Sequence, residues 1–261
     1  MPRSSATFAV WSSAWLAGSA APDDVLDALA PWADAHDVLA ADDATAAATG
    51  LPAPGAPVTS LTFLFAALRR APRGPARLVL TAPGDVRGLP GPGPFASAVI
   101  AAEEGVLFGE AGLGVVPSAV ADGVVRWTVY SVPTPVAPAE YVPLAEAENE
   151  LRRQVRESTS LLTELGVARH RPGVREEIAA ALRARPATHW PAGMPPRALR
   201  VLQQADEVEA ILAAALVDEP GGAVTASAAT ARREALRPLE TAVRVARRAA
   251  VAEAVRTYAP A

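Results

Sequence analysis

The sequence predicts an α+β protein in which an N-terminal mixed α/β domain with a small sheet, residues 1–138, precedes an antiparallel helical bundle, residues 139–261. Up to residue 132, short apolar runs of strand length alternate with helix-like segments. Pro133, Pro135 and Pro138 then form a stiff, extended linker. Beyond Pro143, apolar residues recur three or four positions apart, which is typical of amphipathic helices.

Each element of the first half has its own local signal. Residues 7–16 alternate around Phe8 and Val10 and predict a buried first strand. Pro22, followed by two aspartates, predicts the start of a helix that reaches Trp32. The other expected elements are a proline-rich loop at 51–57, a helix at 61–68, a strand at 77–81, a helix at 95–103, a strand at 106–108 and a last strand at 124–132.

Four helices are expected in the second half, at 144–165, 172–184, 196–218 and 225–258. Gly166 and the Pro-Gly-Gly sequence at 220–222 are the expected ends of the first and third. Short connections between helices favour an antiparallel bundle. Its alanine-rich seams bury little area per residue, which leaves room for a dimer interface.

The composition excludes several kinds of site. The chain has no Cys, and all 24 of its basic side chains are Arg, so Lys is absent as well. Disulfides, thiolate nucleophiles, Cys-ligated metals, a Walker A lysine and a Schiff-base lysine are therefore excluded. The alanine-, proline- and arginine-rich composition resembles that of proteins from high-GC bacteria. No cofactor is predicted.

Charge differs along the chain. Residues 1–150 hold 16 acidic side chains and 7 Arg, whereas residues 151–261 hold 12 acidic side chains and 17 Arg. Opposite charges of this kind attract each other within a chain or between chains, so a homo-oligomer or a protein partner is expected as one interpretation. Two ordinary solvated surfaces are the alternative.

The N-terminal segment shares some features with an export signal. Residues 4–22 carry no charge, and the small residues at 18–21 mimic a cleavage site, but Ser12 and Ser13 interrupt the apolar run. Prolines interrupt another uncharged stretch, 44–68, and argue against a membrane-spanning helix. We expect a cytoplasmic protein without a membrane segment.

The most distinctive stretch is the Gly/Pro-rich loop at 82–94, which follows a predicted strand and precedes a predicted helix. Arg87 has the fork geometry that binds phosphate or carboxylate, and Asp85 would orient it or bind a hydroxyl. Glycine N–H groups and the helix N-terminus would add donors. The candidate ligand-binding residues are Asp85, Arg87, Gly88, Gly91 and Gly93. The alternative is a rigid loop with an internal Asp85–Arg87 pair, because four prolines remove donors and no G-x-G-x-x-G or P-loop is present.

A second group of residues combines carboxylates with one imidazole: Asp34, His36, Asp37, Asp42 and Asp43. Its spacing matches neither an EF-hand nor H-E-x-x-H, so a solvated acidic loop is preferred and no metal site is predicted. His170 lies between two arginines and His189 lies in a proline-bounded loop. Both are interpreted as surface residues, because no G-x-S-x-G accompanies them.

The last helix carries an arginine face, with Arg233, Arg237, Arg244 and Arg248 as a candidate interaction surface. Such a face can contact nucleic-acid phosphates. The acidic pI of about 5.5 and the low aromatic content argue against this, and a solvated face or one docked on acidic residues is preferred.

The sequence therefore favours a non-catalytic interaction or ligand-sensing protein. An enzyme or a protein that binds a small anion or nucleotide through the 84–94 loop is the alternative. A nucleic-acid-associated regulator acting through the arginine-rich helix is the third interpretation.

Overall fold

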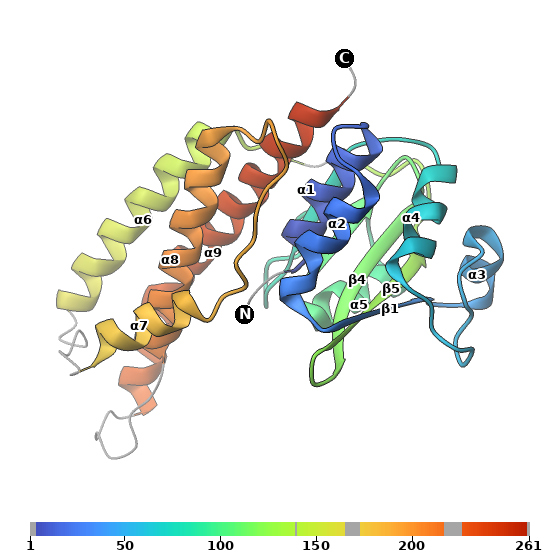
Figure 1. The fold of residues 1–261 in the computed structure, drawn as a ribbon. Coiled ribbons are helices and arrows are strands. Elements are labelled where there is room, and N and C mark those ends of the chain that lie inside the picture. The colour runs from blue at the N-terminus through green and yellow to red at the C-terminus, as the bar shows by residue number, and fades with distance from the viewer. Residues whose placement is uncertain (1–3, 139, 165–172, 217–225, 260–261) are drawn as a thin grey trace. The chain divides into compact units, whose positions relative to one another are not determined.

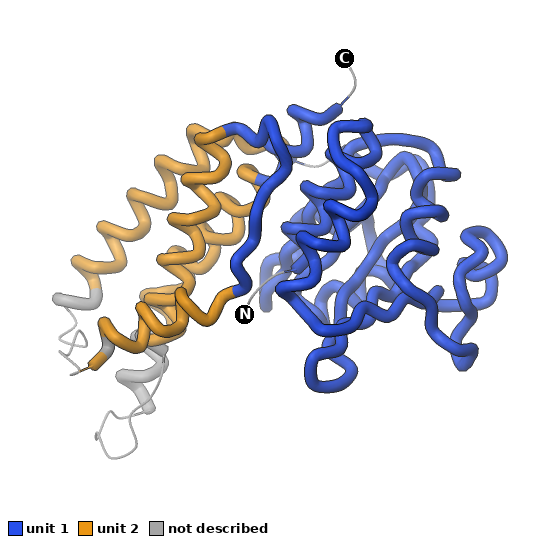
Figure 2. Tube along the Cα trace, in the orientation of Figure 1, with its two compact units in different colours: residues 1–140, 186–195, 251–261 blue, residues 141–185, 196–250 orange. Residues whose placement is uncertain are grey.

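The computed structural model describes residues 4–138, 140–164, 173–216 and 226–259 (Figure 1). The chain divides into two units, coloured separately in Figure 2. Unit 1 consists of residues 1–140, 186–195 and 251–261, and unit 2 of residues 141–185 and 196–250. Unit 1 therefore takes in two segments from the second half of the sequence. The domain boundary at 138/139 stays a prediction.

Unit 1 contains a five-stranded mixed sheet with the order β1-β5-β4-β3-β2. The first strand, β1, is parallel to β5, and the remaining neighbours are antiparallel, so β2 to β5 form a meander and β1 lies beside the last strand of it. The strands are β1 (Ala35–Ala40), β2 (Ala76–Leu80), β3 (Glu104–Phe108), β4 (Leu113–Ala121) and β5 (Val124–Ser131).

Helices cover both faces of this sheet. On one face α1 contacts β2, β3 and β4, while α4 contacts β1 and α2 packs on α1 (Figure 1). On the other face α5 contacts β3, β4 and β5. The helical elements up to residue 102 are α1 (Ser4–Leu16), α2 (Pro22–Leu29), a 3-10 turn (Ala30–Trp32), α3 (Asp43–Thr49), α4 (Leu61–Arg70) and α5 (Pro94–Ala102).

The expected strand at 7–16 is wrong, because these residues belong to helix α1. Every residue from Ser4 to Trp15 is buried, so the helix lacks the one-sided apolar pattern that identifies amphipathic helices. Phe8 lies against Phe108 and Trp127 of the sheet, with ring centroids 6.0 and 4.9 Å apart. The hydroxyl of Ser13 donates to the carbonyl of Ala9 at 2.7 Å. Ser13 interrupts the apolar run in the sequence, but its hydroxyl is hydrogen-bonded within the buried helix.

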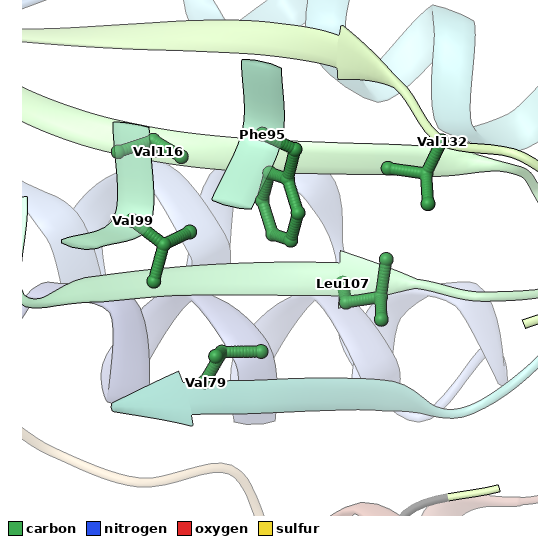
Figure 3. Close-up of a cluster of buried hydrophobic side chains, with 6 residues drawn as sticks. All are labelled: Val79, Phe95, Val99, Leu107, Val116 and Val132. Atoms are coloured by element: carbon green, nitrogen blue, oxygen red, sulfur yellow. The ribbon is translucent and has the colours of Figure 1, made fainter. Parts of the chain in front are cut away.

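The α5 face of the sheet has its own apolar cluster, drawn in Figure 3. Phe95 and Val99 are one helical turn apart on α5 and lie over Gly114 of β4 and Gly105 of β3. A Cβ added at Gly114 would lie 2.3 Å from Phe95, and one at Gly105 would lie 2.7 Å from Val99. The two glycines thus let α5 approach the sheet closely. The cluster consists of Val79, Phe95, Val99, Leu107, Val116 and Val132.

The other expected elements of the first half are present, with ends that shift by a few residues. Strands β1 and β4 and helix α3 are additional. Strand β1 occupies part of the expected acidic loop, and Asp42 begins α3 by accepting a hydrogen bond from the Thr45 N–H at 2.7 Å. Pro117 obscures β4 in the sequence, but it lies beyond Val115, where the pairing of β4 with β3 ends. A strand tolerates proline where one neighbour is missing.

The second half is helical, as predicted, with α6 (Leu144–Glu164), α7 (Val174–Arg183), α8 (Pro196–Leu216) and α9 (Ala226–Tyr258). The helix ends expected at Gly166 and at 220–222 lie outside the described residues. Within unit 2, α8 contacts both α6 and α7. The antiparallel arrangement of a complete bundle stays a prediction.

Candidate functional site

The candidate loop connects the end of β2 with the start of α5. The hydroxyl of Thr81 donates to the carbonyl of Val99 at 3.1 Å and ties the beginning of the loop to α5. Ala82 and Asp85 then exchange two backbone hydrogen bonds, of 3.0 and 2.8 Å, across a tight turn. Gly84 lies inside that turn with φ +79°, a conformation that glycine adopts without strain. The chain therefore leaves the sheet in a fixed direction.

Asp85 and Arg87 form a bidentate pair. The Arg87 Nε donates to Asp85 Oδ1 at 2.8 Å and its Nη2 donates to Oδ2 at 3.0 Å. The Arg87 backbone N–H adds a bond of 3.3 Å to Oδ1. The Asp85 side chain is only 9% exposed, whereas that of Arg87 is 46% exposed. The hydrogen bonds to Asp85 raise the pKa of Arg87. This is the internal pair that the sequence offered as the alternative to a ligand site.

The rest of the loop divides into an anchored and an exposed part. Leu89 packs against the apolar cluster beneath α5. Gly91 and Gly93 have φ values of +130° and +153°, and a Cβ at either would meet no atom within 4 Å. The structure thus brings Asp85 and Arg87 together, leaves Gly91 and Gly93 beside open space and half-buries Gly88. Ligand binding by these residues stays a prediction.

The candidate arginine face of α9 is not uniformly exposed. Arg233 and Arg237 are exposed, Arg248 is half-buried, and Arg244 is buried. The neighbouring Arg247 is also buried. Of this face, Arg233 and Arg237 are therefore the side chains most accessible to a partner, whereas Arg244 and Arg247 lie inside unit 2.

Arg247 belongs to a charge network within unit 2 that the sequence analysis missed. Its guanidinium pairs with Asp206, and both of its terminal nitrogens lie 3.2 Å from Glu209 oxygens. Arg185 binds the same two acids at 2.6 Å. Burial alone would raise the pKa of Glu209, but the arginines lower it to about 2. The available signal was the pair of acids at i and i+3 on one helix, facing an arginine-rich helix.

His36 has a structural role. The indole N–H of Trp127 donates to His36 Nδ1 at 3.0 Å, which leaves Nε2 as the donor to the carbonyl of Leu29, also at 3.0 Å. Burial lowers the pKa of His36, so the ring is held in its neutral form. Both ring nitrogens are used inside the protein.

Two of the acidic residues around His36 have different partners. Asp37 pairs across the sheet with Arg126 at 3.4 Å, and Asp42 caps α3. Among the residues that the structure describes, no three His, Asp or Glu side chains gather to hold a metal ion. His189 is exposed, and His170 lies outside the described residues.

Among the described residues, no helix is both long and apolar enough to cross a bilayer.

Comparison with known proteins identifies relatives along nearly the whole chain. Residues 5–141 match the Rv1486c-like protein, N-terminal domain, and residues 145–248 match the Rv1486c-like protein, C-terminal domain. Uncharacterized protein Rv1486c of Mycobacterium tuberculosis is 38% identical over 280 aligned positions that cover 95% of both chains. Uncharacterized protein ML1804 of Mycobacterium leprae is 34% identical, and MAV321 of Mycobacterium avium is 31% identical, with the same coverage.

No solved structure matches the chain. The three relatives are mycobacterial, which fits the high-GC bacterial source that the composition indicates. Both halves of the chain match family profiles, and the identity to full-length relatives exceeds 30%. The chain therefore belongs to the Rv1486c-like family.

Proposed function

We propose that this protein acts without catalysis, as an interaction protein, and that the 82–94 loop is its contact surface for a protein partner. The observation that carries the proposal is the combination of rigidity and exposure in this loop. Asp85 and Leu89 anchor it, while Val86 and Arg87, next to the anchors, are 55% and 46% exposed.

Rigidity favours binding because association costs the entropy of ordering loops and side chains. In this loop that cost is already reduced by four prolines, whose φ angles are fixed, and by the Asp85–Arg87 fork. The fork fixes the orientation of the planar guanidinium, a group that stacks on aromatic rings as well as donating hydrogen bonds. A partner would meet a surface that changes little on binding.

The exposed chemistry is also that of an interface. An isolated exposed valine is ordinary on a protein surface, but Val86 adjoins an oriented arginine, and arginine is enriched among residues that dominate binding energies. Burial of Val86 would supply the apolar part of the contact, and Arg87 the polar part. The partner surface should therefore offer an apolar pocket beside hydrogen-bond acceptors.

The test compares two matched charge insertions. Val86→Asp places a carboxylate in the proposed contact, and Val120→Asp does the same at a valine of β4 that is 42% exposed. Affinity capture from the native host, followed by quantitative mass spectrometry, should identify a partner that wild type and Val120→Asp retain. The amount of this partner captured by Val86→Asp should be at least tenfold lower than the amount captured by wild type.

Two results would contradict the proposal. If Val86→Asp retained each captured protein, the loop would not be part of the interface. Equal loss from both variants would indicate a general effect of surface charge. Light scattering of the same three proteins over a salt series tests whether the partner is a second copy of the chain.

Binding of a small anion or nucleotide at residues 84–94 is the second candidate, favoured by the half-exposed Arg87 and the open space beside Gly91 and Gly93. An anion would have to compete with Asp85 for the guanidinium. Thermal shift with inorganic phosphate should then be smaller for Arg87→Ala than for wild type. Equal shifts would exclude Arg87 from such a site.

Nucleic-acid association through α9 is the third candidate, supported by the exposed Arg233 and Arg237. Retardation of DNA or RNA at low salt, lost on their replacement, would support it. Absence of retardation would exclude it. The cytoplasmic location expected from the sequence stays a prediction beside these proposals.

The antiparallel bundle is likewise a proposal for the helical half. It is supported by ion pairs that connect neighbouring helices of unit 2, Glu148 with Arg197 at 2.8 Å and Arg247 with Glu209 at 3.2 Å. Both pairs join side chains about 40 residues or more apart in the sequence. Chemical cross-links between the same helices would test it.

A further inference from the structure

A proline-bounded segment from the second half of the sequence, residues 186–195, completes unit 1 (Figure 2). We call it the strap. Its first part forms neither helix nor strand, and Pro191 to Met194 then form a turn in which the Met194 N–H donates to the Pro191 carbonyl at 3.2 Å. Gly193 has φ +85°, the value that a type II turn requires at this position.

Two buried aromatic side chains hold the strap by its carbonyl groups. The indole Nε1–H of Trp11, on α1, donates to the carbonyl of His189 at 2.9 Å. The hydroxyl of Tyr258, in the last turn of α9, lies 3.2 Å from the Pro191 carbonyl and 3.1 Å from that of Ala192. Trp11 is 5% exposed and Tyr258 is 7% exposed.

Apolar contacts surround these hydrogen bonds. The His189 ring meets the Trp11 ring edge-on, with centroids 5.1 Å apart. Pro191 is buried, and a Cβ at Gly193 would lie 4.0 Å from the Tyr258 ring. Burial raises the pKa of Tyr258, so its hydroxyl stays protonated and remains a donor.

This is how proline-containing peptides are recognised. Because proline has no N–H, such peptides offer mainly carbonyl acceptors and rigid apolar rings. Aromatic side chains with a polar end, tryptophan and tyrosine, supply both the donor and the apolar surface. The strap therefore occupies unit 1 as a bound peptide would, although it is part of the same chain.

We propose that Trp11 and Tyr258 form a peptide-binding site for an extended proline-containing segment that ends in a Pro-x-Gly turn, and that the strap is its tethered, autoinhibitory occupant. A proline-containing segment of a partner protein, with the same chemistry, would compete with the strap for this site. This site is separate from the 82–94 loop, so the proposal does not depend on the function proposed for that loop.

The strap is suited to exchange. Within the described residues, the strap contacts α1 and α9 through side-chain hydrogen bonds and ring contacts, without a backbone ladder. A segment held in this way opens at lower cost than a strand within a sheet. The tether gives the strap a millimolar effective concentration, so a free peptide competes poorly until the strap is weakened.

The first experiment weakens the strap and supplies it again in trans. Residues 187–193 are replaced by a Gly/Ser sequence of equal length with Ser at position 193, which keeps the carbonyls, loses the buried proline and disfavours the turn. The probe is a fluorescein-labelled synthetic peptide with the sequence of residues 186–195, followed by anisotropy. It should bind the strap-replaced protein at least tenfold more tightly than wild type.

Two sets of variants test the recognition itself. In the strap-replaced protein, Trp11→Phe and Tyr258→Phe should each weaken peptide binding about fivefold, because each removes one hydrogen-bond donor. A peptide with Gly193→Val keeps every carbonyl but resists the turn, and should bind at least tenfold more weakly. Tyr141→Phe, on an exposed tyrosine, is the matched control and should have no effect.

The proposal is overturned if a folded strap-replaced protein does not bind the peptide, if it binds no better than wild type, or if both aromatic substitutions leave the affinity unchanged. Circular dichroism shows whether the strap-replaced protein folds. If it does not, hydrogen exchange on the full-length chain decides. Tyr258→Phe should then speed exchange of the strap amides about fivefold relative to wild type and Tyr141→Phe, and equal rates would refute the site.

Discussion

At the scale of single residues, the Asp85–Arg87 pair divides the candidate loop into a buried structural side chain and an exposed one. The aspartate is buried and the arginine is half-exposed, so the carboxylate depends on its neighbour more than the guanidinium does. A buried acceptor that loses its donors costs more than a solvent-facing donor that loses its acceptor. The carboxylate is thus the structural member of the pair, and Arg87 is the member that a partner can reach.

This asymmetry gives a prediction for Asp85→Asn. The change removes the charge of the fork, and we expect the free energy of unfolding to fall by about 1 kcal/mol, a modest value because solvent screens the exposed Arg87. Urea denaturation measures it. Asp27→Asn, at an exposed position of α2, should change the stability little. Equal effects of the two substitutions would contradict a structural role for Asp85.

This pair stood in the sequence as the alternative to a ligand site, because its partners are two positions apart. No such proximity in the sequence indicates the partners of His36, which are Leu29 and Trp127. Trp127 is 91 residues away in the sequence, and no local pattern connects it with His36. For the same reason the acidic residues near His36 resemble one cluster in the sequence, although Asp37 pairs with Arg126 of β5 and Asp42 caps α3.

At the scale of elements, close packing of α5 on the sheet depends on two glycines. Alanine at Gly114 would place its Cβ 2.3 Å from the Phe95 ring, and a ring held in the core cannot move aside freely. We expect Gly114→Ala to lower the free energy of unfolding by about 2–3 kcal/mol, as overpacking does. Thermal or urea unfolding would show it.

Gly109→Ala is the matched control for this substitution. Its Cβ would lie 3.6 Å from Val136, an ordinary contact distance, so the change should be small. A Gly114→Ala protein as stable as Gly109→Ala would show that α5 moves away from the sheet without cost, contrary to the packing described above.

The charge network of unit 2 connects α8 with α9 and makes stability depend on pH. The folded-state pKa of Glu209 is about 2, against an ordinary value of 4.5. Because the folded pKa is depressed, the stabilisation is complete above pH 4.5 and is lost as the pH falls toward 2. The shift corresponds to about 3 kcal/mol.

We therefore expect Glu209→Gln to be less stable than wild type by about 3 kcal/mol at pH 7, since it leaves Arg247 buried with one acid fewer. The difference should shrink between pH 4.5 and 2. Denaturation at a series of pH values measures it. Glu157→Gln, which removes an exposed partner of Arg153, should have little effect at any pH. A difference that does not depend on pH would contradict the network.

Among the elements, the expected strand at 7–16 failed for a physical reason. Periodicity identifies a helix by the contrast between its buried and exposed sides, and α1 is buried on all sides. Helices α6 to α9 were found because each has exposed polar positions beside its apolar ones, so the contrast is present. No local sequence pattern predicted β1 and β4, because the strands that pair with them determine that they form. For β1 that strand is β5, which is distant in the sequence.

At the scale of the whole molecule, the boundary between the units changes the meaning of the charge distribution. Unit 1 holds 14 acidic side chains and 8 Arg, whereas unit 2 holds 14 acidic side chains and 16 Arg. A division at residue 150 cuts through α6 and assigns its first acids to the wrong side. The helical unit is thus nearly neutral, and long-range attraction between copies is a weaker expectation than the linear sequence implied.

The same organisation gives a prediction about fragments. A chain that ends at residue 141 contains the sheet and α1 but lacks the strap and the last turn of α9, which belong to unit 1. Trp11 would lose its hydrogen-bond acceptor and apolar surface of α1 would face water. We expect this fragment to bind a hydrophobic dye and to lack a cooperative unfolding transition. A fragment that unfolds as cooperatively as the full chain would contradict the assignment of these segments to unit 1.

The sequence by itself determined the mixed α/β character of the fold, the helical second half and the position of the 82–94 loop, and it offered the pairing of Asp85 with Arg87 as the alternative to a ligand site. These features depend on local periodicity, on proline and glycine, and on residues close together in the chain. Tertiary structure alone decided that residues 7–16 form a buried helix, that β1 lies beside β5, and that the strap contacts Trp11 and Tyr258. Each of these depends on contacts between segments that lie far apart in the sequence, and the free energy of such contacts overrides local preference.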